Sequence, residues 1–266
     1  MKDRIVSVFS NLTERSIETK AWLGEKFTTA GFIVKEGFDP DSELIVCIGG
    51  DGAFIQALHE CDFPETPFLG INTGHLGFFQ EYVPENVDLC IENYLNGHYR
   101  IQPLTTVGAE ISHSRGHDVL RALNEVVIRT TNFYTVHLSI SIGGSFIEKF
   151  SGDGICVASP AGSTAYNYSL GGAIVDPRLK VLQVTPIAPM NTTAYRSFTS
   201  SILLPSDLYL GVVPEEKYEE IKVIIDSIEN KFENVKEIKI KISDKVVNLV
   251  RFESYDFWDK VKTKFL

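Results

Sequence analysis

The sequence lacks the signals of several common protein classes. Its four cysteines, Cys47, Cys61, Cys90 and Cys156, are scattered without a C-x-x-C pair. We interpret them as structural, buried thiols in a reducing cytoplasm. The first residues have no apolar signal core, and no uninterrupted apolar run is long enough to span a bilayer. We therefore expect a soluble, cytoplasmic protein.

Positive charge is scarce as well. The chain has 25 Lys and Arg against 35 Asp and Glu, which gives a formal net charge of -10. This balance argues against a large nucleic-acid interface and against binding to an anionic membrane. An anionic nucleotide would need a local positive site instead.

Three short motifs are also absent. Without G-x-x-x-x-G-K-[ST] the chain is not a P-loop enzyme, and without G-x-G-x-x-G it lacks the ordinary dinucleotide fingerprint. His113 and His117 are four residues apart, but Gly116 lies between them and the glutamate of H-E-x-x-H is missing. We expect a solvated loop there rather than a zinc site.

The first hundred residues alternate between strand and helix patterns. Expected strands are residues 5–9, 32–34, 44–48 and 67–71, and expected helices are residues 13–30, 53–59 and 85–95. This alternation predicts an α/β domain over residues 1–100, with a parallel sheet covered by helices.

The composition changes after about Arg100. Alternating, β-branched runs follow at residues 119–130, 134–142, 155–158, 201–204, 208–213, 219–225 and 235–242. They predict an all-β, sandwich-like domain of antiparallel strands over residues 101–250. Residues 258–265 look like a short helix, so we expect residues 251–266 to return to the N-terminal domain.

The chain is organised around the turn Gly49-Gly50-Asp51-Gly52. It follows five consecutive apolar residues, which are typical of a parallel strand buried on both faces. Asp51 thus stands at the carboxyl end of a strand, where open α/β sheets bind ligands, and the next helix could point its amides at phosphate. Alternatively, Asp51 is only a helix N-cap. A second glycine-rich turn, residues 72–78, would lie near Asp51 if the two strands are neighbours.

Four later stretches are unusually polar or glycine-rich. Asn124-Glu125 interrupts the run 119–130, either inside a strand or at a strand end with surface polar groups. Residues 150–154 repeat the glycine-flanked aspartate, which alone suggests a hairpin turn. Residues 159–173 could pack a flat heterocycle or form a long structured loop, and residues 186–189 form a turn stiffened by two prolines.

Together these motifs resemble the NAD kinase family, which phosphorylates the 2'-hydroxyl of the adenosine ribose of NAD to give NADP. The resemblance runs from Leu44 to about Pro189. Gly-Gly-Asp-Gly also occurs in lipid kinases and phosphofructokinases, whereas its combination with Asn124-Glu125 and residues 162–166 is specific. The resemblance implies NAD in a cleft between the domains, ATP with a divalent metal cation such as Mg²⁺, and a homodimer or homotetramer.

The resemblance also implies a role for individual residues, none of them a metal ligand. Asp51 would be the catalytic carboxylate, because a carboxylate can orient a ribose hydroxyl and accept its proton. The substrate-binding residues would be Gly50 and Gly52 beside the donor phosphates, Phe78 in the pocket wall, Asn124 and Glu125 at the ribose and adenine, Asp153 at the nicotinamide carboxamide, Ser163, Thr164, Ala165, Tyr166 and Ser169 around the adenine and ribose, and Ala188 near the nicotinamide.

The sequence departs from the family pattern at three positions. Ala53 replaces a usual Thr, Ala161 a usual Thr or Ser, and Ser151 an Arg found in some relatives. Losing the hydroxyl at position 53 would weaken donor binding by on the order of 1 kcal/mol. Ala53 leaves open a catalytically weak NAD or NADP sensor, and the shared Gly-Gly-Asp-Gly turn leaves open a lipid kinase.

Overall fold

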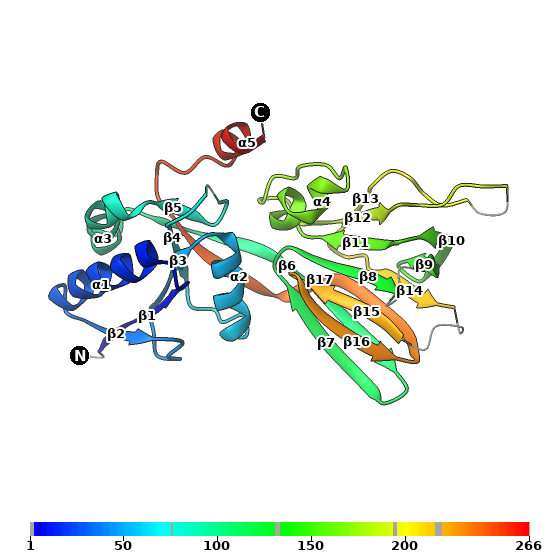
Figure 1. Ribbon diagram of the computed structural model, residues 1–266, viewed down its shortest axis with the longest axis horizontal. Helices are drawn as coiled ribbons and strands as arrows, with labels where there is room; N and C mark the ends of the chain where they lie inside the picture. Colours follow the sequence, from blue (N-terminus) through cyan, green and yellow to red (C-terminus); the bar gives the residue numbers. More distant parts are fainter. Residues whose placement is uncertain (1–2, 76, 131–133, 194–195, 216–219, 266) are drawn as a thin grey trace. The chain divides into compact units, whose positions relative to one another are not determined.

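The chain forms two compact units in the computed structural model, which describes residues 3–75, 77–130, 134–193, 196–215 and 220–265 (Figure 1). Unit 1 comprises Met1–Pro103 and Val247–Leu266, and unit 2 comprises Leu104–Val246. Two strands, β6 (Arg100–His113) and β17 (Val235–Arg251), run across the boundary and contribute to both units.

Unit 1 contains a parallel sheet, as the sequence predicts. Its strands are β1 (Arg4–Ser10), β2 (Phe32–Glu36), β3 (Leu44–Gly49), β4 (Phe68–Asn72) and β5 (Gln80–Tyr82). The order is β17-β4-β3-β1-β2, with β5 beside β4. Every residue of β3 is buried, which explains why this strand shows no alternation of apolar and polar residues.

Helices pack on both faces of this sheet. They are α1 (Glu14–Thr29), α2 (Asp51–Glu60) and α3 (Val87–Leu95), and a 3-10 turn, η1 (Pro84–Asn86), precedes α3. The C-terminal helix α5 (Phe257–Phe265) contacts the loop at residues 77–80. Leu23 and Phe27 of α1 share one core cluster with Ile48 of β3. Phe54 of α2 lies against Phe68 and Phe79, with ring centroids 5.4 and 4.8 Å apart. The core therefore fixes where α2 begins, at the end of β3.

Unit 2 is a sandwich of two sheets, which confirms the predicted fold class. Its strands are β7 (Gly116–Ala122), β8 (Glu125–Thr130), β9 (Val136–Ile142), β10 (Ser145–Gly152), β11 (Gly154–Ala158), β12 (Val181–Ile187), β13 (Ile202–Pro205), β14 (Leu210–Pro214), β15 (Glu220–Ile225) and β16 (Ile228–Glu233), with the unit 2 parts of β6 and β17. One sheet has the order β10-β9-β14-β17, continued by β6 and β7, and the other is β13-β12-β11-β8-β15-β16.

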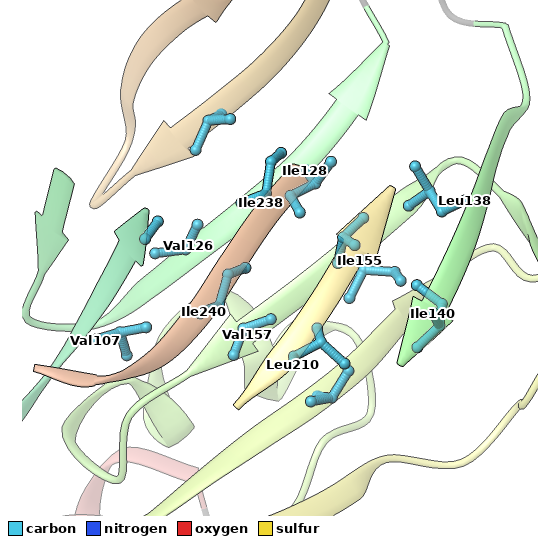
Figure 2. Close-up of a cluster of buried hydrophobic side chains, with 14 of the residues drawn as sticks. Val107, Val126, Ile128, Leu138, Ile140, Ile155, Val157, Leu210, Ile238 and Ile240 are labelled. Carbon is cyan, nitrogen blue, oxygen red and sulfur yellow. The ribbon is translucent and has the colours of Figure 1, made fainter. Parts of the chain in front are cut away.

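Branched side chains from both sheets fill the space between them. Figure 2 shows Ile140 and Ile238 of the first sheet in one cluster with Val126, Ile128 and Ile155 of the second. All five are at most 1 % exposed. At about 1.5–3 kcal/mol for each fully buried branched side chain, this layer dominates the stability of the unit. The second sheet leaves its other face to the polar loop formed by η2 (Ala161–Thr164) and α4 (Tyr166–Ser169).

Two sequence-based expectations need correction. The run 119–130 is not one strand: it breaks at Leu123-Asn124 into β7 and β8, which belong to different sheets. Asn124-Glu125 therefore lies where the chain passes from one sheet to the other, and both residues are buried rather than on the surface. His113 and His117 lie in the strands of a tight β6–β7 hairpin rather than in a loop.

The described part of the chain contains no helix with the length and apolar character needed to cross a membrane. All four cysteines are buried and free, as predicted.

Candidate active site

Asp51 is held by the second glycine-rich turn. Because β3 and β4 pair in parallel, with Gly49 opposite Asn72, the two turns leave the sheet side by side. The backbone N–H of Phe78 donates to both carboxylate oxygens of Asp51, at 3.0 and 3.1 Å, and that of Phe79 donates to Oδ1 at 3.1 Å. The N-cap of α2 is Gly50, which makes no side-chain bond. The interpretation of Asp51 as a simple helix cap is therefore wrong.

Glycines on both turns make this geometry possible. A Cβ at Gly77 would lie 2.4 Å from Asp51 Oδ1, so only glycine lets the loop approach the carboxylate. Gly49 has φ +152°, and a Cβ there would meet the methyl group of Ala53 at 2.6 Å. At Gly50 and Gly52, in contrast, a Cβ would meet no atom within 4 Å. These two residues leave open space beside Asp51.

The C-terminal helix α5 packs against the same loop. The Phe78 ring lies against Phe257 and Phe265, with centroids 5.8 and 5.9 Å away, and is 6 % exposed. Phe78 therefore gives its amide to Asp51 and its ring to packing under α5. Lys264 Nζ lies 3.8 Å from Asp51 Oδ2. Lys264 and Gly77 were not among the predicted site residues, although the second glycine turn and the four-residue spacing of Lys260 and Lys264 are visible in the sequence.

In unit 2, a buried aspartate holds Asn124-Glu125. Asp226 Oδ2 accepts the N–H of Leu123 at 2.7 Å, and Oδ1 accepts those of Asn124 at 2.7 Å and Glu125 at 3.3 Å. The Asp226 N–H donates back to the carbonyl of Glu125 at 3.1 Å. Asp226 and Ser227 form the turn between β15 and β16, with φ of 46° and 71°. Asp226 was not among the predicted site residues, because it belongs to none of the motifs in the sequence.

This arrangement leaves two buried polar atoms unused. Asn124 Oδ1 and Glu125 Oε2 have no hydrogen-bond partner among the described residues. Burial, and then the charge of Asp226, raise the pKa of Glu125 to about 8, although the backbone N–H of Tyr166 opposes the shift. A buried polar atom without a partner costs about 1–3 kcal/mol, so this site is suited to a polar ligand.

The loop from residue 159 to 173 packs its backbone against Asn124. The Ser163 hydroxyl is fully buried: it donates to the carbonyl of Pro160 at 2.7 Å and accepts the N–H of Val175 at 2.9 Å. Its role in the structure is to fold the loop. Thr164 and Ala165 are half-buried, and Tyr166 and Ser169 are exposed.

Asp153 and Ala188 lie next to each other at the ends of β10 and β12. The N–H of Asp153 donates to the carbonyl of Ile187 at 2.8 Å. Ala188 has φ +43°, a conformation that costs a non-glycine residue energy and that clusters at functional sites. Asp153 lines a cavity of about 240 Å³ with Arg129 and Lys222.

The three departures from the family pattern have simple surroundings. Ser151 is buried, and its hydroxyl is 2.8 Å from His137 Nδ1. The cations of the cavity beside Asp153 are instead Arg129 and Lys222. The methyl group of Ala53 fits against Gly49, and Ala161 begins η2.

Gly162→Ala tests the contact between the loop and Asn124. A Cβ at Gly162 would lie 2.0 Å from the Asn124 carbonyl oxygen, so the backbone must shift. We expect the free energy of unfolding, measured in urea, to fall by about 1–3 kcal/mol or more. Gly24→Ala in α1, where a Cβ meets nothing within 4 Å, is the matched control. It should gain up to about 1 kcal/mol of stability. Equal stability of the two variants would contradict the tight contact.

Comparisons with known proteins show to which family the chain belongs. The ATP-NAD kinase N-terminal domain family matches residues 6–99, and the ATP-NAD kinase C-terminal domain family matches residues 123–252. The NAD kinase of Finegoldia magna is 36 % identical over 99 % of this chain and 98 % of its own length. That of Staphylococcus carnosus is 34 % identical over 84 % of each chain.

Two solved structures share the fold. The yeast NADH kinase, crystallised with NADH, has a TM-score of 0.86 at 18 % identity and covers 98 % of this chain and 86 % of its own. An NAD kinase from Archaeoglobus fulgidus in complex with ATP has a TM-score of 0.79 at 22 % identity, covering 97 % and 99 %. Since both family domains match in order and relatives above 30 % identity align over most of their length, this chain belongs to the NAD kinase family.

Proposed function

We propose that Asp51 is the catalytic carboxylate with which this NAD kinase converts NAD to NADP. Asp51 accepts the proton of the 2'-hydroxyl of the adenosine ribose, and the freed oxygen bonds to the γ-phosphorus of ATP. The bond from the γ-phosphorus to the β–γ bridging oxygen breaks, and ADP leaves. The observation that carries this role is the carboxylate fixed by two backbone amides at the carboxyl end of β3, with open space at Gly50 and Gly52.

Unit 2 supplies the binding of NAD in this proposal. The unused oxygens of Asn124 and Glu125 are suited to hydroxyl and amino donors of an adenosine. With a pKa of about 8, Glu125 is mostly protonated at neutral pH, so it can also donate a hydrogen bond. Thr164, Ala165, Tyr166 and Ser169 would line the same adenosine, and Asp153 and Ala188 would hold the nicotinamide.

A divalent metal, with Mg²⁺ the proposed ion, would arrive with ATP as part of the substrate. Among the described residues, no three His, Cys, Asp or Glu side chains gather to hold a metal. The metal would neutralise phosphate charge during transfer. The free, buried thiols support a cytoplasmic location. Exposed apolar side chains of unit 2, among them Phe146, Ile147 and Leu203, support assembly as a homodimer or homotetramer.

The proposal is tested by incubating the purified protein with NAD, ATP and Mg²⁺ and measuring NADP with an NADP-specific dehydrogenase. We expect NADP to form with turnover in the range of about 1–100 per second. Parallel reactions with NADH, with polyphosphate and with lipid acceptors define the substrates. Binding of NAD without formation of NADP would instead identify a sensor.

A further inference from the structure

Three cations from the C-terminal part of the chain converge on the loop that holds Asp51. Arg251 Nη2 donates to the carbonyl of Phe78 at 3.0 Å. Lys260 Nζ donates to the carbonyl of Gly77 at 2.9 Å and also to that of Gln80. The loop therefore has its carbonyls bound by these cations, while its N–H groups of Phe78 and Phe79 face Asp51.

Two of these cations, Arg251 and Lys260, bind groups of the protein itself. Arg251 is 2 % exposed and pairs with Glu81 Oε1 at 3.0 Å. Lys260 is surrounded by carbonyls and by the ring of Tyr255, 5.4 Å away, and burial lowers its pKa to about 8. Lys260 anchors α5 on the loop from residue 77 to 80, and Arg251 ties the same loop to the end of β17.

Lys264 differs from both. Its side chain is 35 % exposed, and its contacts are the ion pair with Asp51 at 3.8 Å and the face of the Phe78 ring, 4.8 Å from the centroid. Such a long, partly exposed ion pair is weak. The Lys264 ammonium can therefore give up its ion pair with Asp51 and bind another anion without leaving the site.

A donor phosphate at Asp51 would bring negative charge next to a carboxylate on a chain of net charge -10. Two like charges at contact distance repel strongly near a protein surface unless a cation lies beside them. Among the ion pairs of the described residues, Lys264 provides the ammonium that reaches Asp51. It lies on the side of the carboxylate next to the loop, and Gly50 and Gly52 leave the turn open.

We propose that Lys264 binds the terminal phosphate of the nucleoside triphosphate, that Lys260 positions it by anchoring α5, and that Arg251 holds the loop on which α5 packs. This inference rests on the proposed function, because it gives Asp51 an incoming phosphate. It names the local cation that the acidic composition of the chain requires.

The test compares Lys264→Gln with Lys262→Gln, a matched control on the same helix. Residues 260 and 264 share one helix face, whereas Lys262 points elsewhere and is exposed. Binding is measured calorimetrically with Mg²⁺ and either a non-hydrolysable ATP analogue or ADP. We expect Lys264→Gln to weaken the ATP analogue about tenfold or more and to leave ADP within about twofold, since a charge-assisted bond to the third phosphate is lost.

Kinetics give a second, independent readout. For Lys264→Gln, kcat/KM for ATP should fall about tenfold to hundredfold with KM for NAD unchanged, and Lys264→Arg should recover most of the loss. Lys262→Gln should match the wild type. Thermal unfolding of each variant checks that it is folded.

Three results would overturn the inference. The first is that Lys264→Gln and Lys262→Gln bind the ATP analogue with equal affinity. The second is that Lys264→Gln loses as much affinity for ADP as for the ATP analogue. The third is that Lys264→Gln shifts the pH profile of kcat but binds the analogue with normal affinity. The last would mean that Lys264 acts only through Asp51. Because analogue binding needs no turnover, a wild-type protein that forms no NADP would reject the proposed function and still leave this inference testable.

Discussion

Asp51→Asn lowers kcat for NADP formation by at least about a hundredfold and leaves the Kd for NAD within about threefold of the wild type. The asparagine has the same shape, and its Oδ1 can still accept the N–H groups of Phe78 and Phe79. The fold of the turn is therefore kept. An amide cannot accept the proton of a ribose hydroxyl, so the loss is confined to the chemical step.

The measurement pairs initial rates of NADP formation with NAD binding by calorimetry. Asp62→Asn is the matched control, because Asp62 is an exposed residue of unit 1 with φ +51°, which asparagine tolerates. It should keep wild-type turnover. If Asp51→Asn kept near-normal turnover, Asp51 would have no part in proton transfer.

Local patterns in the sequence predicted unit 1 well. The apolar run at β3, followed at once by glycines, defines a buried strand and a sharp turn from neighbouring residues alone. The alternation of strands and helices then predicts a parallel sheet. In a parallel sheet the two glycine turns lie at the same edge, as the pairing of β3 with β4 shows. The strands, helices and turns of unit 1 were predictable because short segments of the sequence determine them.

Unit 2 was harder to predict because several of its strands do not look like strands. β6 contains Pro103 and Gly108, β12 contains Pro186, and β16 is a half-exposed edge strand rich in polar residues. Their pairing partners stabilise them, and local propensity does not. The run 119–130 was predicted as one strand because both of its parts are apolar. In the structure, the two parts belong to different sheets.

The site residues that were not predicted contact residues far away in the sequence. Asp226 contacts amides about one hundred positions earlier, and Lys264 lies near Asp51 although 213 positions separate them in the sequence. Neither an aspartate in a hairpin turn nor a lysine in a short helix reveals such a contact. Family motifs pointed to the residues proposed to touch a ligand, whereas the groups that contact those residues became visible only in the fold.

Asp226→Asn tests whether this buried carboxylate orients Asn124 and Glu125. The asparagine NH₂ group replaces an acceptor that faces a backbone N–H, so at least one of the bonds at 2.7 Å is lost. We expect a loss of about 2–4 kcal/mol in the free energy of unfolding, since hydrogen bonds to a buried charge are the strong ones. KM for NAD should rise about tenfold, with a smaller change in kcat, because the proposed function assigns Asn124 and Glu125 to the binding of NAD and not to phosphoryl transfer.

A pH profile separates this orienting role from a general loss of packing. The groups facing Glu125 are Asp226 from the β15–β16 turn, the Tyr166 N–H, which donates to its carboxylate, and the Cys156 thiol of β11. Because the pKa of Glu125 is raised to about 8, its contribution to stability is complete below its unfolded pKa and is lost as pH rises through about 8. Without the charge of Asp226 this pKa falls, so the high-pH limb of kcat/KM for NAD should move to lower pH. Asp207→Asn, at an exposed turn of the same unit, should move neither limb. If Asp226→Asn loses stability but keeps the wild-type pH limb and KM for NAD, Asp226 is only part of the scaffold.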